Sequence, residues 1–384
     1  MKKVKLLHIQ LLPLLTGVQN VSLAELSRLD DNKFDKYLVC KEPGALTELC
    51  QKINVNTATC KYFVREISFI KDVCAFFWLY MYLRRNDFDV VHTHSSKTGV
   101  LGRLAARLAG VPMIVHTVHG FSFPSANNRL QQVIYQLLER LGASCSDIII
   151  CLHDADKEIC IQSLKVSSDK IKIVPNGVDL YRFHPSPMDE KVKLRAEKSL
   201  PKNHILVGMV GRLWPQKNPQ LLVDSALDIL KTHQDVSFIF VGDGELRGTL
   251  EDNVDACFKK HFHFLGWRDD TPEILKCLDI FVLPSLWEGM PLAILEALAS
   301  GLPCVVSNIP GNHHLVRNGV NGFLFSPDRQ DELTEIINSL LVNRDKIGFI
   351  SNQARESAVG MYDIKSRVRK VDEIYTKFLS YEQK

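Results

Sequence analysis

Two glutamates, Glu288 and Glu296, stand eight positions apart in a segment that could bind and position a charged ligand. The apolar and partly β-branched residues 280–283 predict a buried parallel strand before them. A polar turn follows this strand, and residues 292–300 predict a short helix. Gly301 suits the end of that helix, because glycine adopts the left-handed cap without a Cβ penalty. Glu288 is therefore expected in the loop and Glu296 in the second turn of the helix.

The start of this helix could hold a phosphate between the two carboxylates. We expect Pro291 at the first helical position, because its ring fixes φ and it has no N–H. The N–H groups of Gly289, Met290 and Leu292 would then be free donors at the positive end of the helix dipole. Such an end binds phosphate, and the side chain of Glu296 would lean back toward it. An ordinary strand–helix–strand unit with two solvated glutamates fits the same spacing.

Two cations occupy a loop after another predicted strand, at 205–210. Arg212 and Lys217 lie beside a glycine there and could bind a negatively charged group, although a solvated basic loop has the same composition. Gly242 begins a loose Gly-x-Gly after the next strand. This is a poor dinucleotide fingerprint, because the third glycine, Gly248, comes one position late.

In the first half of the chain, two histidines follow predicted strands. His94 comes after the strand at 88–92 and His119 after the strand at 112–116. Ligands of an open α/β sheet bind beyond the carboxyl ends of its strands, although hydrogen-bonded loop residues would show the same pattern. No carboxylate or cysteine stands at a spacing that supports metal ligation by these histidines. Gly17, between the first strand and the first helix, could admit a ligand to the backbone or serve as a plain turn glycine.

Strands and helices alternate twice along the 384 residues, which predicts two α/β domains. The first half ends near residue 187, and a polar, charged linker is expected at 188–203. The second half extends to 362, and the amphipathic segment 363–384 predicts a final long helix. We expect the ligand loops of both halves to face one cleft.

Composition narrows the class of protein. Apolar residues make up 46% and charged residues 24% of the chain, as in ordinary globular proteins. A net charge of +3 is too small to indicate nucleic-acid binding. The ten cysteines form no CxxC pair, which favours reduced thiols. The first residues resemble a signal peptide only superficially and predict a buried strand, and no apolar run reaches the ~20 residues that span a bilayer.

One segment, 61–85, is unusually apolar. Its centre, 73–83, has no charged residue and five aromatic ones, and Arg84 and Arg85 follow it. A helix packed against the sheet explains this composition. The alternative is an interfacial helix with its aromatic side chains in lipid and its basic residues at the headgroups.

Taken in order, three motifs resemble the retaining glycosyltransferase family 4. They are Gly211-Arg212 with Lys217-Asn218, Gly242-Asp243-Gly244, and Glu288-Gly289 with Glu296. The resemblance covers essentially the whole chain, since Pro175-Asn176-Gly177-Val178-Asp179, His119-Gly120 and the last helix are also similar to that family. It implies the GT-B architecture of two Rossmann-like domains facing a central cleft, with the last helix returning to the N-terminal domain.

The resemblance also implies roles for individual residues. The first glutamate of the family's EX7E motif, here Glu288, contacts the donor sugar, and the second, here Glu296, holds the ribose hydroxyls. Arg212 and Lys217 hold the diphosphate, and a histidine matching His119 lies by the transferred sugar. Catalytic roles are thus expected for His119, Glu288, Arg212 and Lys217. The residues expected to bind the donor are Gly17, Arg212, Lys217, Gly242, Trp267, Arg268, Glu288, Gly289, Met290, Pro291, Leu292 and Glu296.

These expectations describe a retaining transferase that moves a hexosyl or N-acetylhexosaminyl unit from a nucleotide-sugar, expected to be a UDP-sugar. The segments HTHSSKTGVLGRLAARLAG and HTVHGFSF resemble transferases that build bacterial surface polysaccharides such as O-antigen on polyprenyl diphosphate. The acceptor is then a polyprenyl-diphosphate-linked saccharide, and the protein would work peripherally at the cytoplasmic face of the inner membrane. No cofactor and no metal are expected, because two fixed cations can replace the metal. The family's usual Gly-Gly pair in the N-terminal loop is Thr16-Gly17 here.

Other classes remain open. A GT-B transferase with a soluble or different lipid acceptor, or a GT-B protein that binds nucleotide-sugars without catalysis, has the same motifs. A metal-dependent GT-A transferase would need a DxD motif, and both matches, at 87–89 and 154–156, lie where a strand or helix begins. An epimerase or dehydrogenase would need a glycine fingerprint after the first strand, and that position lacks one.

Overall fold

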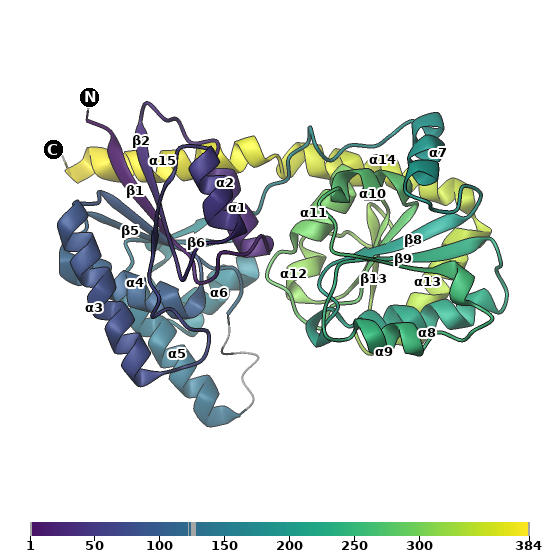
Figure 1. Ribbon diagram of the computed structural model, residues 1–384, viewed down its shortest axis with the longest axis horizontal. Helices are drawn as coiled ribbons and strands as arrows, with labels where there is room; N and C mark the ends of the chain where they lie inside the picture. Colours follow the sequence, from purple (N-terminus) through teal and green to yellow (C-terminus); the bar gives the residue numbers. More distant parts are fainter. Residues whose placement is uncertain (1, 122, 124–127, 383–384) are drawn as a thin grey trace. The chain divides into compact units, whose positions relative to one another are not determined.

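The computed structural model describes residues 2–121, 123 and 128–382 and contains two compact units (Figure 1). Unit 1 comprises Met1–Asn176 with Lys365–Lys384, and unit 2 comprises Gly177–Ile364. The boundary lies earlier than residue 187, because the segment that follows Asn176 is bonded to unit 2. Within this segment Val178 pairs with Asp363, and the carbonyl of Phe183 accepts a hydrogen bond from Arg355 at 2.8 Å.

Unit 1 is built on a seven-stranded parallel sheet in the order β3-β2-β1-β4-β5-β6-β7. Its strands are β1 Val4–Ile9, β2 Phe34–Cys40, β3 Asn56–Thr59, β4 Val90–Thr93, β5 Met113–Thr117, β6 Ile148–Cys151 and β7 Ile171–Ile173. Its helices are α1 Gly17–Leu26, α2 Ala45–Lys52, α3 Phe69–Asn86, α4 Ser96–Ala109, α5 Arg129–Ser144, α6 Asp154–Gln162 and α15 Ile364–Glu382.

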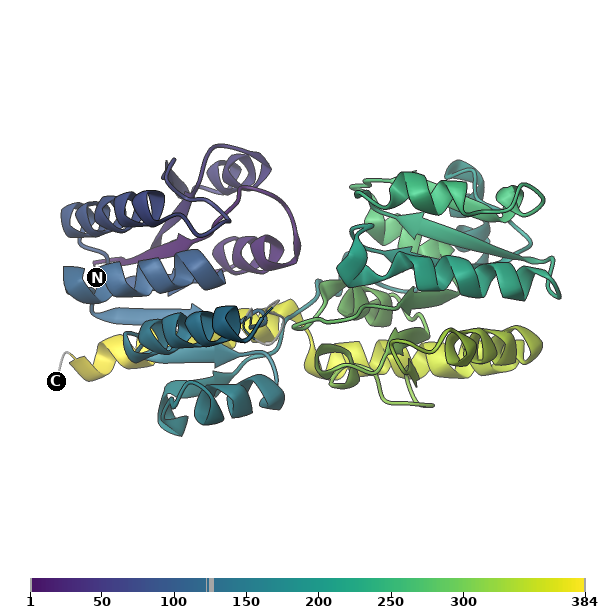
Figure 2. The same ribbon diagram turned by 90° about the horizontal axis from the view of Figure 1, so that it is seen from below.

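The two faces of strand β1 contact different helices. Leu7 and Ile9 belong to a hydrophobic cluster that also contains residues of α3 and α4. His8 points to the opposite face, because side chains alternate along a strand, and there it meets α1 and α15. Figure 2 shows helices on both sides of the sheet in each unit. The strand order reverses between β1 and β4, which is the topological switch point of this sheet.

Unit 2 repeats the pattern with six parallel strands in the order β10-β9-β8-β11-β12-β13, and its switch point lies between β8 and β11. The strands are β8 Ile205–Val210, β9 Val236–Val241, β10 Phe262–Gly266, β11 Ile280–Leu283, β12 Cys304–Ser307 and β13 Gly322–Phe325. The helices are α7 Met188–Glu197, α8 Pro219–Leu230, α9 Arg247–Asp252, α10 Thr271–Cys277, α11 Leu292–Ala299, α12 Pro310–His313, α13 Gln330–Val342 and α14 Arg344–Met361.

Two expectations about the helices of unit 2 were wrong. The stretch expected as a linker contains helix α7, because Arg195 on that helix is buried and donates to the Cys277 carbonyl at 2.8 Å and to Asp279 at 2.6 Å. Its charged composition hid this contact. Pro291 caps α11 with extended backbone (ψ 125°) instead of occupying the first helical position.

The last helix belongs to unit 1, as expected. Tyr375 on α15 is fully buried, and its hydroxyl lies 2.6 Å from Nδ1 of His92 on β4. Arg367, near the start of the same helix, pairs with Glu25 of α1 at 2.8 Å. Across the described residues, none of the helices has the length and apolar character required to cross a bilayer.

Candidate functional site

The predicted motif loops of unit 2 begin at its switch point. The loop from Gly211 follows β8, and the loop that carries Glu288 follows β11, the neighbouring strand. Both lie beyond the carboxyl ends of parallel strands, where ligands bind in open α/β sheets.

Lys217 and Glu288 form one ion pair. The ammonium of Lys217 contacts Oε1 of Glu288, and the Ser285 hydroxyl donates to the same oxygen at 2.7 Å. The side chain of Glu288 is 7% exposed, so this contact is poorly screened by water. Gln216 ties the two loops together through hydrogen bonds of 2.8 and 2.9 Å to the backbone of residues 286–287. The structure thus brings Glu288, which is expected to bind the donor sugar, into contact with Lys217, which is expected to bind the diphosphate.

The Gly-x-Gly motif lies directly against the Arg212 loop. A Cβ on Gly242, which has φ +129°, would stand 2.1 Å from the Gly211 carbonyl oxygen. A Cβ on Gly244 would stand 2.3 Å from the carbonyl oxygen of Leu213. These glycines are therefore required for the packing of the two loops against each other. The exposed guanidinium of Arg212 stacks 4.0 Å above the ring centre of Trp214.

A third loop supports the Glu288 backbone, and sequence reasoning missed it. A Cβ on Gly311, in α12, would lie 2.3 Å from the Gly289 carbonyl oxygen and 2.6 Å from that of Glu288. Asn312, fully buried beside it, donates to the Ser307 carbonyl at 3.0 Å. The Pro-Gly pair that opens α12 was the available sequence signal for a close backbone approach.

Glu296 lies in the second turn of α11 and is not part of the Lys217–Glu288 pair. Desolvation raises the pKa of its carboxyl group to about 7, and the charge of Arg182 opposes this shift. The cation that acts on Glu296 in this way is thus Arg182, which sequence reasoning did not single out. The remaining backbone positions expected at the donor, Gly289 to Leu292, lie in the loop before α11 and in its first turn.

Trp267 and Arg268, which follow β10, differ in their availability. Trp267 is 61% exposed. Arg268 makes a two-pronged contact with Asp270, at 2.7 and 2.6 Å, and Asp270 also pairs with Lys198. Arg268 is thus already engaged by Asp270, whereas the indole of Trp267 is accessible in unit 2.

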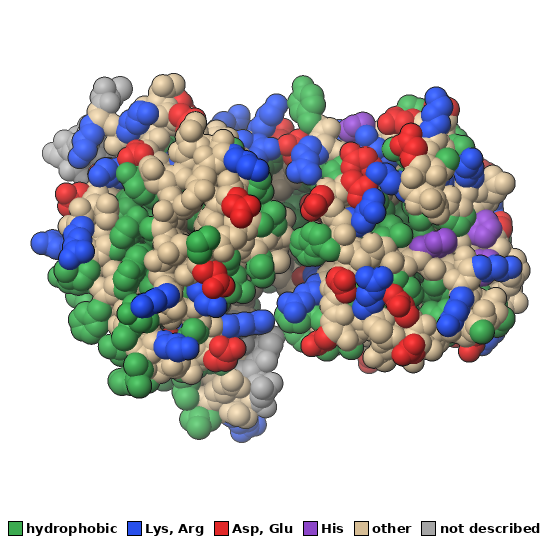
Figure 3. All heavy atoms as spheres, in the orientation of Figure 1, with side chains coloured by type: hydrophobic (Ala, Val, Ile, Leu, Met, Phe, Trp, Pro, Cys, Tyr) green, Lys and Arg blue, Asp and Glu red, His purple; other side chains and the backbone are tan. Residues whose placement is uncertain are grey.

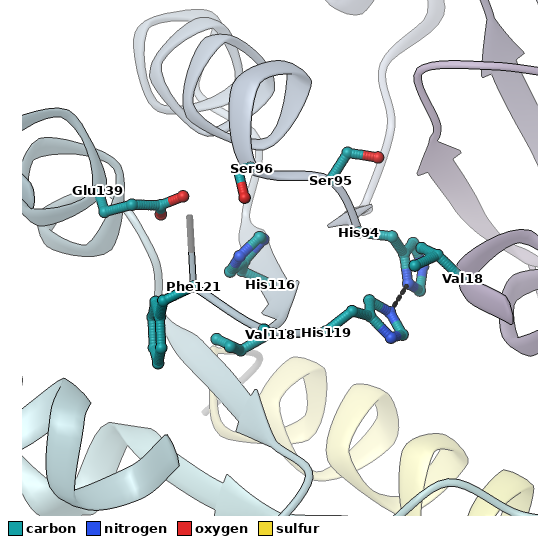
Figure 4. Close-up of a pocket in the computed structure, with 10 residues that line it drawn as sticks. Val18, His94, Ser95, Ser96, His116, Val118, His119, Phe121 and Glu139 are labelled. Atoms are coloured by element: carbon teal, nitrogen blue, oxygen red, sulfur yellow. Dashed lines mark hydrogen bonds between the residues drawn. The ribbon is translucent and has the colours of Figure 1, made fainter. Parts of the chain in front are cut away.

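In unit 1, His94 and His119 meet at the carboxyl ends of β4 and β5. Nδ1 of His94 lies 3.2 Å from Nε2 of His119, and Figure 4 shows this contact at the edge of a pocket of about 200 Å³. The pocket is lined by Val18, His94, Ser95, Ser96, His116, Val118, His119, Gly120, Phe121 and Glu139. Gly17 precedes one of these residues, opens α1 instead of lying in a loop, and has no atom within 4 Å of an added Cβ.

Behind the pocket lies a buried cluster that sequence reasoning did not find. The possible ligand atoms of His8, Glu25, His92 and His94 all lie within 4.8 Å of one another. Glu25 thus supplies a carboxylate beside these histidines, although no carboxylate stands near them in the sequence at a spacing that indicates metal ligation. Both ring nitrogens of each of the three histidines have hydrogen-bond partners within the described residues. Burial, followed by the charge of Arg367, lowers the pKa of His8 to about 3.

Sequence comparisons agree with this geometry. A family model described as Glycosyltransferase Family 4 matches residues 15–182, and one described as Glycosyl transferases group 1 matches residues 190–357. The Escherichia coli UDP-Gal:alpha-D-GlcNAc-diphosphoundecaprenol alpha-1,3-galactosyltransferase is 47% identical over 379 residues, or 97% of each protein. The chain belongs to glycosyltransferase family 4. The expectation of a glycosyltransferase is thereby confirmed.

Other relatives of this glycosyltransferase extend the comparison. A Campylobacter jejuni N,N'-diacetylbacillosaminyl-diphospho-undecaprenol alpha-1,3-N-acetylgalactosaminyltransferase is 28% identical over 285 residues, covering 71% of this chain and 72% of the relative. Anabaena HepE, solved in complex with UDP and glucose, superposes with a TM-score of 0.82 at 21% identity, covering 97% of this chain and all of that one. This likeness confirms the GT-B fold.

Proposed function

We propose that this glycosyltransferase moves a galactosyl unit from UDP-galactose to an N-acetylglucosamine carried on polyprenyl diphosphate, with retention, during surface polysaccharide assembly. The observation that carries this proposal is the 47% identity, over 97% of both proteins, to the E. coli enzyme of that name. An α-linked product from an α-linked donor corresponds to retention.

Lys217 and Arg212 stabilise the leaving UDP in this proposal. Breaking the sugar–phosphate bond increases the negative charge on the diphosphate, so fixed cations bind the transition state more tightly than the ground state. Each charge-assisted hydrogen bond contributes about 1.5–3 kcal/mol. The amide groups at the start of α11 add donors at the positive end of a helix dipole. With this charge stabilisation from the chain itself, we expect transfer to continue in EDTA.

Glu288 is assigned to the donor sugar, where an ionised carboxylate orients hydroxyls and favours positive charge at the anomeric carbon. It serves as a positioning group and not as a nucleophile. The acceptor hydroxyl approaches on the face of the leaving group, and a donor phosphate oxygen takes its proton. Binding of the diphosphate would draw Lys217 from Glu288, because each phosphate oxygen competes for the same ammonium protons.

We also propose that unit 1 rests on the membrane that carries the acceptor. Helix α3 buries Ala75, Leu79 and Leu83 but leaves a second apolar face exposed, so it packs on α4 and still offers a surface to lipid. Figure 3 shows hydrophobic side chains gathered over this helix. Exposed apolar residues of α3 are Phe69, Ile70, Val73, Phe77 and Met81, and those of α5 are Leu130, Val133, Ile134, Leu137, Leu138 and Leu141.

A product assay tests the reaction. Purified protein is incubated with UDP-galactose, UDP-N-acetylgalactosamine, UDP-glucose or UDP-N-acetylglucosamine, each with a lipid-diphosphate-linked or a free N-acetylglucosamine acceptor. We expect UDP release and an α-linked disaccharide with UDP-galactose and the lipid-linked acceptor, with and without EDTA. Transfer restricted to another donor, or equal rates on the free sugar, would overturn the assignment of substrates.

Vesicle flotation tests the membrane contact. The triple variant Phe69→Ser/Ile70→Ser/Phe77→Ser removes exposed apolar side chains from α3, whereas Phe76 and Trp78 are avoided because they pack against the core. The matched control is Val342→Ser/Phe349→Ser, two exposed apolar residues of unit 2. We expect the α3 variant to lose flotation with anionic vesicles and the control to keep it. Equal flotation of both folded variants would refute the contact.

A further inference from the structure

An unbroken chain of hydrogen-bonding contacts joins the last helix of unit 1 to the pocket. The Tyr375 hydroxyl lies 3.3 Å from Nε2 of His8, and Nδ1 of His8 lies 3.1 Å from Nε2 of His94. Nδ1 of His94 then lies 3.2 Å from Nε2 of His119. A side branch runs from the same hydroxyl to His92, 2.6 Å away. The chain therefore connects residues that are more than 250 positions apart in the sequence.

The imidazoles in this chain are neutral. Burial, together with the nearby charge of Arg367, lowers the pKa of His8 and of His119 to about 3. The pKa values of His92 and His94 are also lowered, chiefly by burial. A neutral imidazole donates from one nitrogen and accepts at the other, so the tautomer of each ring constrains the tautomer of the next.

The contact distances assign the protons. The 2.6 Å contact between Tyr375 and His92 is shorter than N–H donors make and falls in the range of O–H donors, so the phenol donates to Nδ1 of His92. His92 then donates from Nε2 to the Thr117 hydroxyl at 2.8 Å. The longer 3.3 Å contact is a bond donated by Nε2–H of His8 to the phenol oxygen. Nδ1 of His8 is left as an acceptor, and the Ser22 hydroxyl lies 2.8 Å from it.

The remaining protons follow from that assignment. Two nitrogen lone pairs facing each other at 3.1 Å would repel, so opposite the unprotonated Nδ1 of His8 the proton of His94 lies on Nε2, and His94 accepts at its own Nδ1. His119 therefore donates from Nε2 to His94, and its Nδ1 carries the lone pair.

We propose that Tyr375 is a positioning residue that acts through His8 and His94 to hold His119 as the Nε2–H tautomer, with an accepting Nδ1. This inference rests on the proposed transfer reaction and on the place beside the transferred sugar that the family resemblance implies for His119. An unprotonated ring nitrogen accepts a hydrogen bond from a sugar hydroxyl, whereas the other tautomer would present a donor there. The returning helix α15 thus contributes to the site in unit 1 in addition to packing against that unit.

The tautomer of His119 can be observed directly by ¹⁵N NMR of the histidine rings in the intact enzyme. The His119 signals are assigned by their loss in His119→Asn. We expect the Nε2–H tautomer in the wild type. In Tyr375→Phe, Nε2–H of His8 has no acceptor, so we expect His8 to change tautomer and His94 and His119 to change with it. A His119 ring that is Nδ1–H in the wild type, or unchanged in Tyr375→Phe, would overturn the proposal.

The matched control is Tyr362→Phe. Tyr362 is a second buried tyrosine near the chain end, but its hydroxyl donates to the His314 carbonyl at 3.2 Å in unit 2. In Tyr362→Phe we expect the His119 signals to match those of the wild type. If Tyr375→Phe does not fold, His94→Gln interrupts the same chain at its middle, and there we expect His119 to populate both tautomers. A single unchanged tautomer in His94→Gln would also overturn the proposal.

Kinetics distinguish this proposal from the proposed function. We expect Tyr375→Phe to lower kcat about tenfold with the donor KM within about twofold, and Tyr362→Phe to leave both unchanged. A His119→Asn enzyme with wild-type kcat would refute the role of His119 while leaving the tautomer measurement intact. Stoichiometric metal in the purified protein, ligated by His8 and His94, would overturn the proposal, because the nitrogens of these two rings would bind the ion instead of one another.

Discussion

The two units place chemically opposite groups at equivalent positions of their sheets. At the switch point of unit 2, Lys217 and Glu288 form an ion pair between loops that follow neighbouring strands. At the switch point of unit 1, the corresponding groups are neutral imidazoles such as His8 and His92, both fully buried. Charged loops can respond to an anionic ligand, whereas a buried neutral network can only fix the orientation and proton of its last member.

The two sets of residues also differ in whether they belong to the core of their unit. The residues of unit 2 come from loops after neighbouring strands, so each can be removed without loss of the core. Those of unit 1 lie on β1, α1, β4 and α15 and form part of the core itself. Substitutions in unit 1 should therefore reduce stability first, and those in unit 2 should reduce turnover first.

The largest effect is expected from Arg367→Met in unit 1. Arg367 is buried, pairs with Glu25 at 2.8 Å and donates to the Val174 and Pro175 carbonyls at 2.8 and 2.9 Å. Its removal leaves a buried carboxylate without its partner, which typically costs about 3–5 kcal/mol of unfolding free energy. Thermal unfolding followed by calorimetry should show an early transition of unit 1.

The control for this prediction lies on the same helix. Glu373→Gln removes an exposed partner of Lys377, and such surface pairs contribute about 0–1 kcal/mol. The double variant Arg367→Met/Glu25→Leu should recover part of the lost stability, because it removes the unpaired carboxylate as well. Equal unfolding of Arg367→Met and Glu373→Gln would remove the distinction between the two units.

The next effect is expected in unit 2, on turnover. Lys217→Ala removes the ammonium assigned to the diphosphate, and loss of one such group typically lowers kcat by about 10²–10³-fold. Rates of UDP release measure it, with Lys231→Ala as control, since Lys231 is an exposed lysine paired with Asp228 on α8. A Lys217→Ala enzyme with unchanged turnover and donor affinity would show that the charged loop of unit 2 has no catalytic role.

The sequence predicted the two sites unequally, for a physical reason. Strand β11 was predicted with its observed bounds, because a short apolar run between turn residues has few alternatives. Lys217 and Glu288 were singled out because they stand in loops after predicted strands, and the resemblance to the family implied their roles. Their direct contact was not predicted, since it depends on how two loops lie after neighbouring strands.

The histidine cluster could not be predicted in the same way. Residues 8, 92 and 375 look like ordinary strand or helix residues in their own segments, and the position of His94 after a strand gave no sign of its buried partners. Only the strand order brings β1 beside β4, and only the returning helix adds Tyr375. Helix α7 was missed for a related reason. Its charged residues indicated an exposed linker, although one of them, Arg195, is buried and paired with Asp279.

A smaller effect, in the pH dependence of donor binding, tests whether Glu296 differs from the rest of unit 2. Its pKa is raised from 4.5 to about 7 by burial, so it is ionised above that pH and protonated below it. A protonated carboxyl accepts ribose hydroxyls poorly, and the donor KM should rise about tenfold from pH 8 to pH 6. Glu296→Gln should show a flat profile between these pH values.

The same titration has an opposite effect on stability. Between about pH 4.5 and 7 the folded state binds more protons at Glu296 than the unfolded state, so the free energy of unfolding falls as pH rises. Glu296→Gln should remove this slope. If the donor KM of Glu296→Gln kept the pH dependence of the wild type, another group would be responsible for it.

The smallest effect is expected from Trp267→Ala, which removes an exposed side chain of unit 2 that was expected at the donor. The indole is 61% exposed, and substitutions at such surface positions usually change stability by less than about 0.5 kcal/mol. If the donor base stacks on this ring, its loss costs about 1 kcal/mol or more, which is roughly a fivefold rise in donor KM. The control Trp287→Ala removes a second exposed tryptophan from the same unit, with only its backbone engaged by Gln216. A larger KM effect at Trp287 than at Trp267 would move the base to the loop after β11 and leave Trp267 without a role.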